Sequence, residues 1–167
     1  MKKLLVLGDP NDAPDLKERF AARAVLLNEN GEVHLMLVSK HRYHKLPGGG
    51  IDNGESIDRA LHRELMEEVG CRAEIIAELG IIEEFRSYDD NDMLHQISYC
   101  YLAKQVGDQQ ESALEEDEIE EGLQHVLAPS LEVAISMLEN DEPNNKEGEF
   151  IRQRDLAFLI AAKEHIL

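Results

Sequence analysis

The sequence predicts an α/β or α+β sandwich, in which helices pack on the faces of a β-sheet. Segments typical of strands and segments typical of helices both occur along the chain. The length of 167 residues is that of one ordinary domain, so we expect residues 1–167 to form a single compact unit. The hydrophobic fraction of 43% and the charged fraction of 31% are typical of a globular protein.

The first part of the chain predicts strands separated by turns. Residues 4–7 are expected to form a short strand or an ordered arm, and two further strands are expected over residues 20–27 and 33–39. Asn30 and Gly31 lie between these two strands and are a strong signal for a tight turn. Residues 46–50 contain a proline and three glycines, which suit neither helix nor strand interiors, so an irregular loop is expected there.

A helix is predicted from Ser56 to Val69. Leu61, Leu65 and Val69 recur at four-residue spacing and form one apolar stripe. Ser56 is a favourable N-cap residue, because its side-chain oxygen can accept a hydrogen bond from the first turn. Gly70 stands where the C-terminus of a helix favours a left-handed residue.

The second half predicts strands and then helices. Strands are expected over residues 71–86 and 93–104, a polar turn over 88–92, an acidic stretch over 108–121 and a last strand over 123–127. One helix is expected after Ser130, then a polar loop over 141–148, and a final helix from about Glu149 to the end. The apolar residues of the final helix are expected in the core, with a dimer interface as the alternative: Ile151, Phe158, Leu159 and Ile160. We therefore expect a monomer or a homodimer.

The charge balance argues against polyanionic partners. The chain has 17 Lys and Arg against 35 Asp and Glu, a formal net charge of −18. This charge would repel DNA, RNA and anionic membranes, so we expect neither a nucleic acid nor a membrane as partner. A small anionic substrate is compatible with it where metal ions or a local basic patch assist.

The cysteine content and the N-terminus indicate a cytoplasmic location. The two cysteines, Cys71 and Cys100, allow at most one bridge, which fits a reducing compartment. The apolar run from Leu4 to Leu7 is shorter than the roughly 7–15 residues of a signal peptide. No stretch approaches the length needed to cross a bilayer.

Three glutamates crowd one face of the predicted helix. Glu64 precedes Glu67 by three residues and Glu68 by four, which are the spacings of neighbours on a helix surface. Like charges so close destabilise each other, whereas a bound Mg²⁺ or Mn²⁺ would favour them, because hard cations prefer carboxylate oxygens. The alternative is a solvated amphipathic helix with a charged surface.

Arg63 and the glycines extend this cluster. Arg63 lies four residues before Glu67 and could orient the acidic set, and Glu55 is a second candidate partner for its guanidinium. The run of Gly48, Gly49 and Gly50 lets backbone groups approach a metal or a phosphate closely.

Residues 49–71 resemble the Nudix box. That signature is G-x5-E-x7-R-E-U-x-E-E-x-G-U, where U is a bulky aliphatic residue. Its fixed positions fall here on Gly49, Glu55, Arg63, Glu64, Glu67, Glu68 and Gly70. The only departure is Cys71 at the last position, where cysteine packs as a small apolar residue.

The resemblance implies a Nudix-type α/β/α sandwich with a mixed β-sheet, and hydrolysis of a nucleoside diphosphate linked to another group X. It implies that Glu64, Glu67 and Glu68 bind Mg²⁺ or Mn²⁺, that the Gly48 carbonyl is a further ligand, and that Arg63 and Glu55 form an orienting pair. Because the family varies in this role, Glu64 is a candidate for the catalytic base as well as for a ligand.

Residues outside the box are further candidates for catalysis and for substrate binding, and each has a structural alternative. Some family members supply a base or ligand from a distant loop, so either Glu118 or Glu120 of the acidic stretch is a candidate, the alternative being a solvated loop face. Arg42 and Lys45, in a basic patch, could hold substrate phosphates or protect an exposed hairpin edge. Tyr43 could stack on a base or pack in the core.

Together these features predict a Mg²⁺-dependent pyrophosphohydrolase of small nucleotides. A nucleoside triphosphate, oxidised or not, cleaved to a monophosphate and pyrophosphate, is the first expectation, as in the MutT-like branch. ADP-ribose or a nucleotide sugar is the second. The alternative from another class is a nucleotide-binding sensor without turnover.

Overall fold

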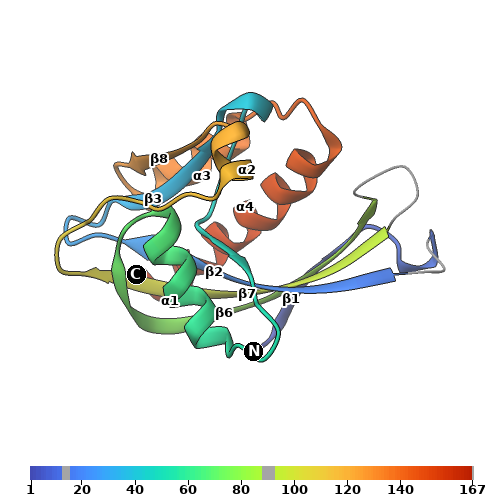
Figure 1. The fold of residues 1–167 in the computed structure, drawn as a ribbon, viewed down its shortest axis with the longest axis horizontal. Helices are drawn as coiled ribbons and strands as arrows, with labels where there is room; N and C mark the ends of the chain where they lie inside the picture. Colours follow the sequence, from blue (N-terminus) through green and yellow to red (C-terminus); the bar gives the residue numbers. More distant parts are fainter. Residues whose placement is uncertain (13–15, 88–92, 167) are drawn as a thin grey trace.

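A computed structural model describes residues 1–12, 16–87 and 93–166, and the predicted polar turn at 88–92 lies outside them (Figure 1). The strands are β1 (Lys3–Leu7), β2 (Leu16–Leu27), β3 (Val33–Val38), β4 (Tyr43–Lys45), β5 (Gly48–Gly50), β6 (Arg72–Ser87), β7 (Met93–Val106) and β8 (Leu123–Ala128). The helices are α1 (Ile57–Glu68), α2 (Glu116–Glu120), α3 (Leu131–Asn140) and α4 (Lys146–Ile166), with short 3-10 turns η1 (Pro10–Asp12) and η2 (Ser39–His41).

The strands of the described chain form one mixed sheet. Its order is β1-β6-β7-β2-β3-β4, with β5 paired to β2 and β8 paired to β3. The pairs β1–β6 and β2–β7 are parallel, and the other pairs are antiparallel. The long strand β2 therefore lies centrally, where β7 pairs along it and the short β5 joins it from the loop before α1.

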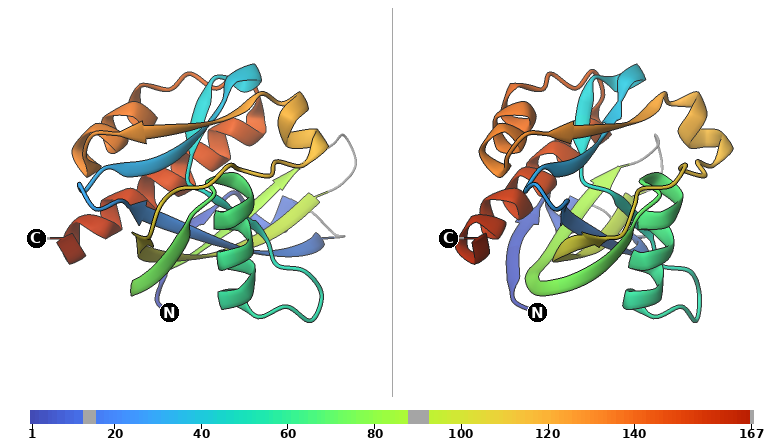
Figure 2. Two further views of the ribbon diagram at one scale, coloured as in Figure 1. Left: turned by 60° about the vertical axis from the view of Figure 1, so that its left-hand side comes forward. Right: turned by 90° about the vertical axis from the view of Figure 1, so that its left-hand side faces the viewer.

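Helices cover both faces of the sheet (Figure 2). Alternate residues of β2 face opposite sides. Val25 packs in the core that includes Phe158 of α4, whereas Leu26 packs in the core that includes Leu65 of α1. This arrangement confirms the predicted α/β sandwich with a mixed sheet.

The helix α1 confirms the sequence prediction in its bounds and caps. The Ser56 hydroxyl accepts a hydrogen bond from the Arg59 N–H at 3.2 Å, and Gly70 has the left-handed φ of 76°. The strands expected over 71–86, 93–104 and 123–127 are also present as β6, β7 and β8. Residues 4–7 belong to β1, which pairs with β6 in parallel.

Other boundaries differ from the prediction for local reasons. Pairing of β2 with β7 begins already at Leu16, so the strand includes the charged residues that precede Phe20. The helix α4 begins at Lys146, because the Asn145 side chain accepts the Gly148 N–H at 2.8 Å and ends the polar loop earlier. Within α4, Ile160 is 50% exposed, so its placement in the core was wrong, unlike that of the other three apolar residues.

The prediction of an irregular loop over residues 46–50 was wrong for residues 48–50. Gly48, Gly49 and Gly50 form β5, which pairs antiparallel with β2. The glycines are needed for the close approach: a Cβ at Gly48 would lie 2.2 Å from the Ala22 carbonyl oxygen, and one at Gly49 would lie 2.5 Å from Cδ of Glu64. Glycine thus forms a strand here because it lacks a side chain.

No helix in the described part of the chain has both the length and the apolar character needed to span a membrane.

A pair of histidines, the buried His34 and the half-buried His125, joins β3 to β8. His34 Nδ1 lies 2.8 Å from His125 Nε2, and His34 Nε2 lies 2.8 Å from the side-chain oxygen of Gln105. The Gln109 amide nitrogen lies 3.4 Å from His125 Nδ1 and also donates to the Val69 carbonyl. All these contacts are satisfied when both rings are neutral, with His125 donating to His34 and His34 donating to Gln105.

We expect this pair to weaken the fold at acid pH. Burial lowers the pKa of His34 and of His125 from the ordinary value of 6.5. Below pH 6.5 the unfolded chain therefore binds protons before the folded chain does, and the free energy of unfolding falls by about 1.4 kcal/mol for each unit of pKa depression. From about one pH unit above 6.5 the pair has no pH-dependent effect, because both states are then neutral.

Urea unfolding at pH 7.5 and at pH 5.5 measures the effect. The variant His125→Gln should lose less stability between these two pH values than the wild type, since other titrating groups are common to both proteins. An equal loss in the two proteins would contradict the prediction.

Candidate active site

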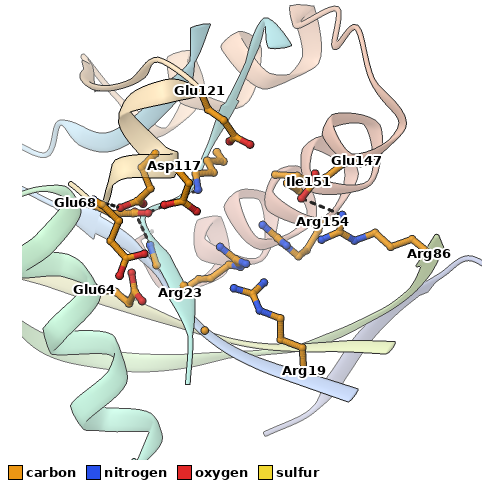
Figure 3. Close-up of a pocket in the computed structure, with 16 residues that line it drawn as sticks. Arg19, Arg23, Glu64, Glu68, Arg86, Asp117, Glu121, Glu147, Ile151 and Arg154 are labelled. Carbon is orange, nitrogen blue, oxygen red and sulfur yellow. Dashed lines mark hydrogen bonds and ion pairs between the residues drawn. The ribbon is translucent and has the colours of Figure 1, made fainter. Parts of the chain in front are cut away.

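A cavity of about 240 Å³ lies between α1, α2, α4 and the strands β2 and β5 (Figure 3). One wall carries carboxylates, from Glu64, Glu68, Glu115, Asp117, Glu118 and Glu121. The other wall carries arginines, from Arg19, Arg23, Arg86 and Arg154. The glycine strand β5 lies between them, so the cavity offers sites for a cation and for an anion side by side.

Glu68 is the most buried of the carboxylates contributed by α1. It is 1% exposed, accepts the Gly48 N–H on Oε2 at 3.0 Å, and has Lys45 Nζ 3.7 Å from Oε1. Burial raises the pKa of Glu68 to about 7, and the facing carboxylate of Glu118 adds to the rise, whereas Lys45 and the Gly48 amide oppose it. Without further positive charge the site therefore disfavours an ionised Glu68.

Glu64 lies one helical turn before Glu68 and directly beneath β5. Its carboxylate fits only because Gly49 has no side chain, and it accepts a hydrogen bond from Arg63 at 2.9 Å. Burial raises the pKa of Glu64, Arg63 opposes this, and the charges of Glu67 and Glu118 add to the rise. Gly49 thus lets the backbone of β5 and the Glu64 carboxylate lie close together.

Arg63 ties the loop before α1 to the acidic cluster. Its guanidinium donates two hydrogen bonds to Glu55, both at 2.9 Å, and one to the Gly50 carbonyl at 2.9 Å. These hydrogen bonds from Arg63 hold the pKa of Glu55 at about 2. The two residues are in the contact expected of an orienting pair.

Glu67, the third glutamate of the cluster on α1, lies outside the cavity. It accepts a hydrogen bond from Arg63 at 3.3 Å and does not belong to the cavity lining. The structure therefore brings together two of the three glutamates that were candidates for metal binding on α1, Glu64 and Glu68.

The acidic stretch supplies the opposite side of the carboxylate wall. Its short helix α2 begins with a capping box, in which the Glu118 side chain accepts the Glu115 N–H at 2.9 Å. Glu118 is half-buried and lines the cavity, whereas Glu120 is exposed and lies outside the lining. Of the two candidates in this stretch, only Glu118 faces the site.

The donor set fits a hard divalent cation. Among the described residues, no three acidic, histidine or cysteine side chains are already gathered into a closed cage. However, Glu64, Glu68 and Glu118 face one another, and the positive side chain on this wall is Lys45. A cation such as Mg²⁺ would relieve their repulsion with the oxygen ligands that it prefers.

The basic patch contributes only partly to the site. Lys45 lines the cavity. Arg42 is exposed and donates to the Glu142 carbonyl at 3.3 Å, away from the lining. Tyr43 is 3% exposed because its side chain points inward against Gly148, so the proposed stacking of its ring on a base was wrong.

The arginine wall was not predicted. Arg19 and Arg23 are four residues apart on β2 and so lie on the same face of the strand. Arg86 comes from the end of β6, and Arg154 comes from α4. One signal was available in the sequence, since Arg23 interrupts the apolar run expected to form a buried strand.

A helix that presents Glu64 and the buried Glu68 to a glycine strand within an α/β/α sandwich is an arrangement that can place a cation beside a phosphate. The NUDIX domain family matches residues 17–149, and the chain belongs to this family. The family membership predicted from the box is thereby confirmed.

Two curated proteins are similar in sequence to part of this chain. A putative 8-oxo-dGTP diphosphatase of Bacillus subtilis (strain 168) is 32% identical over 72 residues, which are 43% of this chain and 48% of that one. An RNA pyrophosphohydrolase of Wolbachia sp. subsp. Brugia malayi (strain TRS) is 41% identical over 63 residues, which are 36% and 39% of the two chains. The matches thus span half or less of these relatives.

Solved structures share the fold over most of the chain. The MutT protein from Methanosarcina mazei Go1 has a TM-score of 0.58 and 19% identity, covering 93% of this chain and 100% of that one. A UDP-X diphosphatase has a TM-score of 0.57 and 17% identity, covering 93% of this chain and 68% of that one. At these identities the likeness shows the fold alone.

Proposed function

We propose that the protein is a Mg²⁺- or Mn²⁺-dependent pyrophosphohydrolase that cleaves a nucleoside diphosphate linked to another group. The observation that carries the proposal is the single cavity in which Glu64 and Glu68 of the box meet Glu118 from a distant segment, beside a wall of arginines. Carboxylates that hold a cation meet the main requirement for attack on an anionic diphosphate, and the arginines add donors for phosphate oxygens beside it.

Each residue has a distinct role in this proposal. Glu64 and Glu68, with the Gly48 carbonyl, would hold the cation, which when bound neutralises phosphate oxygens and lowers the pKa of a water. Arg63 and its partner Glu55 would keep Glu64 in place. Glu118 would take the water proton on its carboxylate, because the cationic Arg63 is paired with Glu64, whereas Glu118 accepts a hydrogen bond from the uncharged Glu115 N–H.

A small nucleoside triphosphate, oxidised or unmodified, is the substrate that we place first, with a monophosphate and pyrophosphate as products. The relative from Bacillus subtilis (strain 168) bears the name of an 8-oxo-dGTP diphosphatase, which supports this choice. The net charge of −18 favours a small nucleotide over a nucleic acid.

We also propose that residues 1–167 act as a single domain in the cytoplasm. Buried Cys71 and Cys100 are free thiols, which suits a reducing compartment.

A nucleotide panel tests the proposed function. Release of phosphate or pyrophosphate is measured for nucleoside triphosphates, 8-oxo-dGTP, ADP-ribose and nucleotide sugars, each with Mg²⁺, with Mn²⁺ and with EDTA. We expect turnover of at least one triphosphate with either metal and none with EDTA. Binding detected by a thermal shift without turnover of any member would support a nucleotide-binding sensor instead.

The same preparation tests the cation site independently of turnover. Millimolar Mg²⁺ should raise the melting temperature, because it binds the folded state and relieves the repulsion between Glu64 and Glu68. The variant Glu74→Gln, on the exposed surface of β6, should respond as the wild type does. A melting temperature that is indifferent to Mg²⁺ would count against the site.

A further inference from the structure

The arginine wall concentrates positive charge in an acidic protein. Arg23 and Arg86 are each 4% exposed and Arg154 is fully buried, while Arg19 stays exposed to solvent. Figure 3 shows the four side chains converging on the end of the cavity opposite Glu64 and Glu68. Buried cations are costly unless anions accompany them.

The buried carboxylates nearby are engaged mainly by Arg154. Its Nε and one terminal nitrogen donate to Asp155 at 2.6 and 3.2 Å, and the other terminal nitrogen donates to Glu84 at 3.0 Å. Asp155 accepts the Leu46 N–H as well. Arg154 is therefore a structural support for the wall, and each of its three nitrogens makes a hydrogen bond within the protein.

Arg86 and Arg23, in contrast, have N–H donors that make no hydrogen bond to the described residues. Among the described residues, Nε and one terminal nitrogen of Arg86 make no hydrogen bond; oxygens of Glu84 and Glu147 lie 3.4 and 3.3 Å from them. Arg23 makes one weak contact, from Nε to the Ser98 hydroxyl at 3.5 Å. Burial, and then the charge of Arg154, lowers the pKa of Arg23 to about 10, while the charges of Asp155 and Glu84 oppose the shift.

The chemistry of the wall selects phosphate rather than a base. None of the described lining residues is aromatic, so the cavity offers no ring for a base to stack on. Guanidinium groups bind phosphate oxygens with paired, charge-assisted hydrogen bonds. Arg23, with one weak hydrogen bond, and Arg86, with two ion pairs but no hydrogen bond from its Nε and one terminal nitrogen to the described residues, are suited to such a ligand.

We propose that Arg19, Arg23 and Arg86 bind a phosphate of the substrate beyond the two phosphates joined by the scissile bond, so that the protein selects substrates with three or more linked phosphates. This inference rests on the proposed function, which places the scissile diphosphate at the carboxylate wall. A substrate such as ADP-ribose, whose diphosphate is flanked by ribose on both sides, would leave the arginines without an anion.

Binding of tripolyphosphate in EDTA tests the subsite without turnover. Calorimetric titration of the wild type should show binding, and Arg86→Met should weaken it by about 10- to 100-fold, the effect of losing charge-assisted hydrogen bonds. Arg72→Met is the matched control, because Arg72 lies exposed at the other end of β6. Equal affinities in all three proteins, or no binding by the wild type, would overturn the proposal.

A second variant tests the subsite even if the buried substitution Arg86→Met prevents folding. Arg19→Met removes an exposed side chain of the same wall, and it should weaken tripolyphosphate binding while leaving the melting temperature within a few degrees of the wild type. If both wall variants bind tripolyphosphate as the Arg72→Met control does, the arginines do not form the subsite.

Measuring kcat/KM for two kinds of substrate distinguishes failure of the phosphate subsite from failure of the proposed hydrolysis. In an active protein, Arg86→Met should lower kcat/KM for nucleoside triphosphates by about 10- to 100-fold more than it lowers kcat/KM for ADP-ribose. An equal loss for both substrates would overturn the selection. Tripolyphosphate binding that depends on Arg86, in a protein that hydrolyses nothing, would support the subsite and reject the catalytic proposal.

Discussion

The variant Glu68→Gln should lose activity and gain stability at the same time. If Glu68 holds the cation, kcat should fall by about 10³-fold, since a metal supplies several kcal/mol of charge stabilisation in such reactions. Glutamine keeps the shape and can still accept the Gly48 N–H, so the fold should survive. Measured kcat with saturating Mg²⁺ checks the first effect, with Glu74→Gln as the control.

The gain in stability follows from the pKa of Glu68 and has a defined pH range. Burial raises that pKa to about 7 in the folded protein from an ordinary 4.5, so the metal-free fold carries the full penalty above pH 7 and none below pH 4.5. Urea unfolding in EDTA should show Glu68→Gln more stable than the wild type by about 1–3 kcal/mol at pH 8. The advantage should disappear near pH 4.

Two results would contradict this account of Glu68. An unchanged kcat would remove Glu68 from the catalytic site, and a variant less stable than the wild type at pH 8 would mean that its charge stabilises the fold. Together, the two measurements separate a residue kept for catalysis from a residue kept for folding.

The variant Arg154→Met should destabilise the protein by about 3–5 kcal/mol, because it removes the cation that ion-pairs with buried Asp155 and one of the two that ion-pair with buried Glu84. Arg154, Asp155 and Glu84 are each fully buried, and three hydrogen bonds link the guanidinium to the two carboxylates. Arg154→Lys should also lose stability, since one ammonium cannot reproduce the planar fork of donors.

Urea unfolding checks this effect, with Lys163→Met on the exposed side of α4 as the control. Asp155 also accepts the backbone N–H of Leu46, just before the glycine strand, so activity should fall together with stability. A loss below 1 kcal/mol, comparable to that of an exposed ion pair, would show that the network contributes little to the fold.

The part of the site within one helix could be predicted from the sequence. The spacing of Glu64 and Glu68 fixes their shared face wherever residues 56–69 are helical, and Arg63 reaches Glu55 across a short loop. The same local logic gave the N-cap at Ser56 and the left-handed Gly70. Local spacing decides these features because the helix has one geometry.

Features that depend on long-range packing could not be predicted. The choice between Glu118 and Glu120 depends on where α2 docks, and the burial of Tyr43 depends on the approach of α4. The placement of Gly48–Gly50 as a strand depends on how closely it can approach β2. Composition alone indicated a loop, because glycine disfavours a strand unless the packing requires its small size.

The sequence by itself determined the helix that bears the carboxylates, the pairing of Arg63 with Glu55, and the family. Only the tertiary structure decided which anions and cations share a cavity. Arg23 of β2, Arg86 of β6 and Arg154 of α4 lie far apart along the chain, and strand pairing and helix docking bring them together. The physical reason is that helical spacing is set by local backbone geometry, whereas a cavity wall is set by packing between distant segments.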